Sequence, residues 1–101
     1  MICIPSSFKL GGRTWDVQYV PLIDDDPNIY GDCDGSEAVI RLKSGAKPEV
    51  LQHTFYHELS HAICFTLGWK KLNKNEDDID ALGGMYYQYL KSKRGKVTNP
   101  E

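Results

Sequence analysis

The clearest chemical signal in the chain is His57-Glu58-Leu59-Ser60-His61, in which two histidines are four residues apart and a glutamate follows the first. Residues four apart on an α-helix differ by about 40° around its axis, so both imidazoles can face one ion. Glu58 is turned by about 100° and can reach a water on that ion without ligating it. Zinc acidifies such a water, and a glutamate takes its proton as it attacks a carbonyl carbon. The spacing therefore predicts metal-assisted hydrolysis.

The next acidic stretch along the chain supplies candidates for a third ligand. Glu76 and Asp80 are four residues apart and share the inner face of a helix packed on the first, so one can ligate the metal while the other orients a histidine. Gly83 continues this face, where its missing side chain would let the helices approach closely. Asp77 and Asp78 point elsewhere. The alternative interpretation for these acids is stabilisation of the helix N-terminus, and for the histidines a surface helix with hydrogen-bonded imidazoles.

The histidine motif lies in the middle of a long predicted helix. Pro48 is acceptable in a first helical turn, and no Gly or Pro follows before Gly68, which stands where a C-terminal cap is expected. These signals predict one helix over residues 48–67. Apolar residues lie on several of its sides, so we expect a central helix covered by other elements. A second helix is predicted from about Asn75 to Lys93.

Two hairpins are predicted before these helices, each from alternating or β-branched residues around turn formers. The first joins residues 8–10 to 14–20 through Gly11-Gly12. The second joins residues 30–33 to 38–42. The predicted fold class is therefore α+β, with a small antiparallel β-sheet of two hairpins packed on the HExxH helix and a second C-terminal helix.

The composition is that of one compact domain. The 101 residues are 41% apolar and 26% charged, so we expect a single domain over residues 1–101 with a flexible tail from about residue 95. A net charge of -2 gives no electrostatic reason to expect nucleic acid or an anionic membrane as partner. The absence of a secretory signal and of a spanning apolar run predicts a cytoplasmic protein, and three irregularly spaced cysteines predict reduced thiols.

The two motifs together resemble a known pattern. His57-Glu58-Leu59-Ser60-His61 followed by Asn75-Glu76-x-x-x-Asp80 is similar to the gluzincin pattern, in which a ligand glutamate lies within an NExxxD stretch on a later helix. The order of the strands and helices also resembles minimal gluzincin domains. It is similar as well to the small HExxH proteins of phages and prophages related to the ImmA/IrrE-type peptidases. The resemblance extends from about Ile4 to Leu90.

The resemblance implies one zinc ion held by His57, His61 and Glu76. It implies in addition that Glu58 is the general base and that Asp80 orients a ligand histidine. In zincins a substrate peptide pairs in extended form with the edge strand next to the active-site helix. By analogy, the strand that precedes this helix is the candidate. The residues expected to contact substrate are Val39, Ile40 and Arg41.

These residues predict a zinc metallopeptidase whose substrate is a peptide or protein. The alternative is a zinc-binding protein without turnover, inactive or latent, that acts as a peptide- or protein-interaction module. It is suggested by the small size of the chain, which offers no large C-terminal subdomain as the far wall of a cleft. In the latent form the basic segment of residues 91–96 would cover the cleft.

The sequence leaves the residue that stabilises the oxyanion open. Tyr30, Tyr86 and Tyr87 are candidates, although tyrosines at helical spacing are more often packing residues. His53, one turn before the motif, is expected to be a partly exposed bystander.

Overall fold

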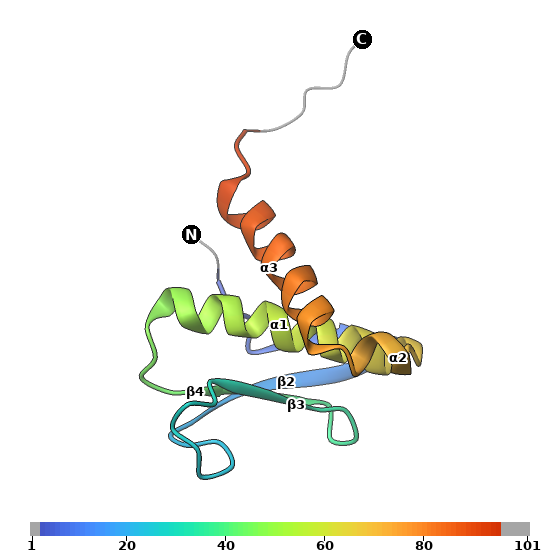
Figure 1. The fold of residues 1–101 in the computed structure, drawn as a ribbon, viewed down its shortest axis with the longest axis horizontal. Helices are drawn as coiled ribbons and strands as arrows, with labels where there is room; N and C mark the ends of the chain where they lie inside the picture. The colour runs from blue at the N-terminus through green and yellow to red at the C-terminus, as the bar shows by residue number, and fades with distance from the viewer. Residues whose placement is uncertain (1–2, 96–101) are drawn as a thin grey trace.

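The computed structural model describes residues 3–95 and has an α+β fold (Figure 1). Its four strands form one sheet in the order β1-β2-β4-β3. Helix α1 lies over one face of this sheet, and α3 packs against α1 and projects from the body of the molecule (Figure 1). The elements are β1 (Ser7–Leu10), β2 (Arg13–Val20), β3 (Gly31–Asp34), β4 (Val39–Lys43), α1 (Pro48–Leu67), α2 (Lys70–Asn73) and α3 (Glu76–Ser92).

The α+β fold is confirmed, but the sheet is mixed rather than antiparallel. Strands β1 and β2 form the first antiparallel pair, and β3 and β4 form the second. Strand β2, however, pairs in parallel with β4. The chain leaves β2 through residues 21–30 and returns as the edge strand β3, so β4 lies between them. Because Ile40 and Leu42 of β4 are fully buried, this apolar strand takes a central position.

Helix α1 is the centre of the fold, as its several apolar sides predicted. It occupies the expected residues, and Gly68 caps it in the left-handed conformation with φ 73°. The sheet lies on one side of α1 and contacts it through β3 and β4. Helices α2 and α3 pack against other parts of α1. The buried core cluster consists of Trp15, Ala38, Ile40, Leu42, Phe55, Tyr56 and Ala62.

Helix α3 approaches α1 closely at Gly83. The side chain of Asn75 caps α3 by accepting a hydrogen bond from the backbone N–H of Asp78 at 3.1 Å. A Cβ atom at Gly83 would lie 2.8 Å from the carbonyl oxygen of Tyr56 and 2.9 Å from the backbone nitrogen of His57. The close approach expected at this glycine is therefore confirmed, and it occurs directly beside the histidine motif.

The short helix α2 was not predicted from the sequence. It follows the Gly68 cap as a single turn, too short for an apolar period to be recognised. Across residues 3–95, no helix combines the length and the apolar character that crossing a membrane requires. The part of the predicted flexible tail after residue 95 lies outside the described residues.

The two neighbouring glycines of α3 offer a matched test of this packing. At Gly84 a Cβ atom would meet only Nε2 of His53, at 3.5 Å. We therefore expect Gly84→Ala to raise the free energy of unfolding by up to about 1 kcal/mol through helix propensity. Gly83→Ala should lower it by about 1–3 kcal/mol, because the new methyl group meets backbone. Urea unfolding followed by circular dichroism measures both; equal stabilisation by the two substitutions would contradict the close approach.

Candidate metal centre

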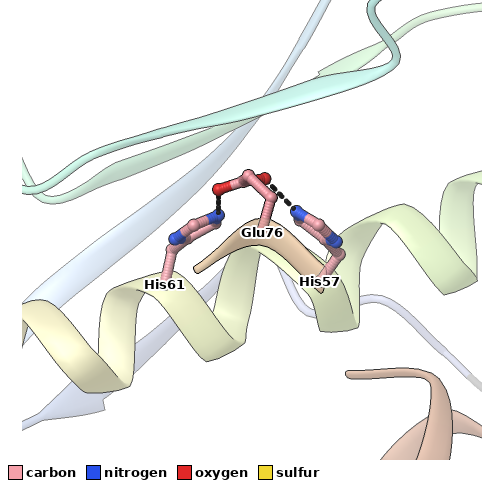
Figure 2. Close-up of side chains that lie close together, drawn as sticks. All are labelled: His57, His61 and Glu76. Atoms are coloured by element: carbon pink, nitrogen blue, oxygen red, sulfur yellow. Dashed lines mark hydrogen bonds and ion pairs between the residues drawn. The ribbon is translucent and has the colours of Figure 1, made fainter. Parts of the chain in front are cut away.

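The structure brings His57, His61 and Glu76 together in one cluster (Figure 2). The carboxylate of Glu76 lies between the two rings, with Oε1 3.2 Å from Nε2 of His57 and Oε2 2.9 Å from Nε2 of His61. All the candidate ligand atoms lie within 4.8 Å of one another. Two atoms bound at about 2.05 Å to a tetrahedral zinc ion are about 3.3 Å apart. The observed spacings therefore suit three ligands of one ion.

Hydrogen bonds on the far side of each ring determine which nitrogen faces the cluster. Nδ1 of His57 donates to Oδ1 of Asp80 at 3.1 Å, since a carboxylate only accepts. Nδ1 of His61 donates to Oδ1 of Asn73 at 2.6 Å. Both Nε2 atoms therefore direct lone pairs toward the carboxylate of Glu76. With the rings in this tautomer, four acceptor atoms face one another, and a proton or a divalent metal ion between them would satisfy them.

Asn73 is the functional residue that sequence reasoning missed. It ends α2, the helix that was not predicted, and it holds His61 as Asp80 holds His57. The signal in the sequence that could have identified it is an asparagine shortly before Glu76. The chain has two such amides, and because Asn75 caps α3, Asn73 is the one that reaches the imidazole.

Glu58 lies next to the cluster and is only 7% exposed. Burial raises its pKa, whereas nearby His57 and His61 lower it. Its side chain borders two hollows. The first has a volume of about 270 Å³ and also borders β3, His61 and Glu76; the second has about 200 Å³ and lies beside His57. From this position the Glu58 carboxylate can contact a group bound in either hollow.

The prediction that residues 38–42, with the substrate contacts Val39, Ile40 and Arg41, form the edge strand is wrong. Strand β4 pairs with β2 on one side and with β3 on the other, so its backbone hydrogen bonds are used within the sheet. Ile40 is fully buried, and the guanidinium of Arg41 forms two hydrogen bonds to Asp32, at 2.9 and 2.8 Å. Strand β4 therefore has no free edge with which a peptide could pair. The error has a topological cause, because the parallel pairing of β2 and β4 leaves no local signal in the sequence.

Strand β3 is the edge strand beside the candidate metal centre. The backbone N–H of Lys43 donates to the carbonyl of Tyr30 at 2.8 Å, which sets the alternation of hydrogen bonds between β3 and β4. In that alternation Gly31 and Cys33 turn their backbone N–H and C=O groups away from β4. Among the described residues no strand pairs with this edge. Gly31 also brings the edge close to α1, since a Cβ there would lie 3.3 Å from Cγ of Glu58.

Cys33 lies on this edge strand and lines the larger hollow. Burial, with smaller contributions from the negative charges of Glu58, Asp32 and Asp34, raises the pKa of Cys33 to about 12. The side chain is therefore a neutral thiol near neutral pH. All three cysteines are free, as the sequence predicted.

Of the remaining candidates, His53 and Tyr30 line the smaller hollow, whereas Tyr86 and Tyr87 do not. His53 is 46% exposed, stacks on Tyr87, and has Nε2 3.9 Å from Oδ1 of Asp80. The hydroxyl of Tyr87 donates to Gln52, and Tyr86 packs edge-on against Tyr56; both tyrosines have packing roles. Tyr30 lines the hollow next to Glu58. Of the three tyrosines considered for the oxyanion, Tyr30 is the one that shares a hollow with Glu58.

None of the family models, curated proteins and solved structures compared with the chain matches it significantly. The gluzincin resemblance therefore rests on its motifs, and the function is argued from the geometry of the site.

Asn73 provides a test of the hydrogen bonds that orient the ligands. Asn73→Ala removes the acceptor for Nδ1 of His61 and should weaken zinc affinity about 10- to 100-fold. Asn73→Asp keeps an acceptor there and should retain most of the affinity. Competition against a chelating indicator measures both constants, with Lys74→Ala, on the exposed neighbour, as control. If Asn73→Ala binds zinc as tightly as the wild type, the residue does not orient His61.

Proposed function

We propose that the protein is a zinc-dependent peptidase. The observation that carries this proposal is the meeting of two Nε2 lone pairs and the Glu76 carboxylate beside the buried Glu58. Two histidines and one carboxylate are a ligand set that leaves a coordination position open. A structural zinc site would instead be closed by a fourth protein ligand.

His57, His61 and Glu76 would hold the ion. When bound, zinc supplies a positive charge that acidifies water and polarises a carbonyl group. Glu58 takes one proton from the attacking water at its carboxylate, while the remaining hydroxyl adds to the carbonyl carbon. As the C–N bond breaks, Glu58 returns the proton to the leaving nitrogen. Burial supports this role, because a raised pKa makes the Glu58 carboxylate a better base.

The free edge of β3 would align the substrate. An extended peptide can exchange main-chain hydrogen bonds with Gly31 and Cys33, which places its backbone next to Glu58. The two hollows on either side of Glu58 then receive side chains of the peptide. In this arrangement β3 takes the part that the sequence assigned to β4.

A second candidate function is a zinc-binding module that holds a peptide without cleaving it. It is favoured by the openness of the site, since Glu76 is 66% exposed. A latent form covered by the basic segment has less support. The described residues 91–95 lie at the opposite end of α3 from Glu76, a helix about 25 Å long, and residue 96 lies outside the described part.

Glu58→Gln tests the catalytic proposal. The amide keeps the size of the side chain but cannot accept the proton, so zinc should still bind while peptide hydrolysis falls by at least about 10²-fold. Mass spectrometry of a peptide-library digest with zinc measures the products. Glu49→Gln, on the exposed start of the same helix, is the matched control and should cleave like the wild type. Undiminished hydrolysis in Glu58→Gln would exclude Glu58 as base, and a zinc-loaded wild type without cleavage would favour the binding module.

A further inference from the structure

Helix α3 carries a row of exposed apolar side chains on one face. Leu82, Met85, Tyr86 and Tyr89 are 50%, 64%, 48% and 60% exposed. Their spacing of three and four residues places them along one stripe, which we call the α3 stripe. Single exposed apolar residues are ordinary, but four contiguous ones on a helix face are typical of an interaction surface. Tyrosine and methionine are also enriched in the centres of protein interfaces.

The α3 stripe is accessible because of the way α3 leaves the body of the protein. The adjacent side of the helix faces α1 through the buried Ile79 and Gly83, and Tyr86 lies at the border, where it packs edge-on against Tyr56. Toward its C-terminal end α3 extends beyond α1 (Figure 1). A second helix can therefore lie along the stripe.

The distribution of charge along α3 favours a second copy of the same helix as this partner. Its first turns are acidic, and its last turn and the residues after it are basic. A second copy of α3 in antiparallel orientation would place the acidic end of each helix beside the basic end of the other. The two helix dipoles would also be opposed, which is favourable. A parallel copy would place acid against acid. The residues concerned are Asp77 and Asp78 at one end and Lys93 and Arg94 at the other, since Glu76 and Asp80 face the histidines of α1 and Lys91 lies 3.8 Å from Glu49.

We propose that two copies of this chain form an antiparallel dimer through the α3 stripe. The two-fold axis passes between Met85 and Tyr86, so that each of these residues meets the other on the second copy. In the same register Leu82 lies opposite Tyr89, and Asp78 lies opposite Lys93. A two-fold interface of this kind is self-complementary. It leaves the candidate metal centre open, because Glu76 faces α1, and it does not depend on the proposed peptidase activity.

The first test is the mass of the protein in solution. Sedimentation from about 1 µM to about 1 mM should show a concentration-dependent shift from one chain of 11.5 kDa to twice that mass. Met85→Lys brings two ammonium groups together at the axis and should abolish the dimer. Gln88→Lys adds the same charge to an exposed position on another face of α3 and should leave it intact. Circular dichroism confirms that both variants are folded.

The second test distinguishes antiparallel from parallel pairing. Asp78→Lys or Lys93→Asp alone places like charges opposite each other twice per dimer and should weaken association on the order of tenfold. The double variant exchanges the two charges and should restore the wild-type affinity. A wild type that stays monomeric would overturn the proposal and leave the stripe to a different protein. A dimer insensitive to Met85→Lys, or a double variant as weak as the single ones, would equally overturn it.

Discussion

The close packing of α3 on α1 at Gly83 determines where the candidate ligands lie. His57 and His61 belong to α1, whereas Glu76 and Asp80 belong to α3, so the cluster exists only while the two helices stay in contact. The glycine allows this, because a side chain there would meet the backbone of α1 at His57. A residue that carries no functional group therefore controls the separation between the ligands.

The hydrogen bonds behind the ligands complete this arrangement. Asp80 and Asn73 accept from the outer nitrogens of His57 and His61, which directs the lone pairs of both rings inward. The sheet contributes on the opposite side, where Gly31 brings the free edge of β3 close to Glu58. In the proposed function the helices would hold the metal ligands, and the edge strand would offer backbone groups to a peptide. Two close approaches connect these elements to α1, namely Gly83 of α3 at the backbone of α1 and Gly31 of β3 beside Glu58.

Local signals predicted much of this structure. Pro48 and Gly68 marked the ends of α1, and Asn75 marked the start of α3, because helix ends depend on neighbouring residues. The parallel pairing of β2 with β4 was not predicted, since it joins strands that are distant in sequence, and the choice of edge strand failed with it. Asn73 was missed because its role depends on α2, a single turn whose position follows from packing.

Zinc binding by the three clustered side chains is the claim on which the proposed function depends. The most direct measurement is native mass spectrometry of the full chain after zinc loading and removal of excess metal, beside Glu76→Ala and Asp77→Ala. Asp77 is the neighbouring exposed acid of the same helix turn and controls for lost negative charge. We predict one retained zinc ion per chain in the wild type and in Asp77→Ala, and loss of that ion in Glu76→Ala. A folded wild type that retains no zinc, or a Glu76→Ala variant that retains it fully, would contradict this site.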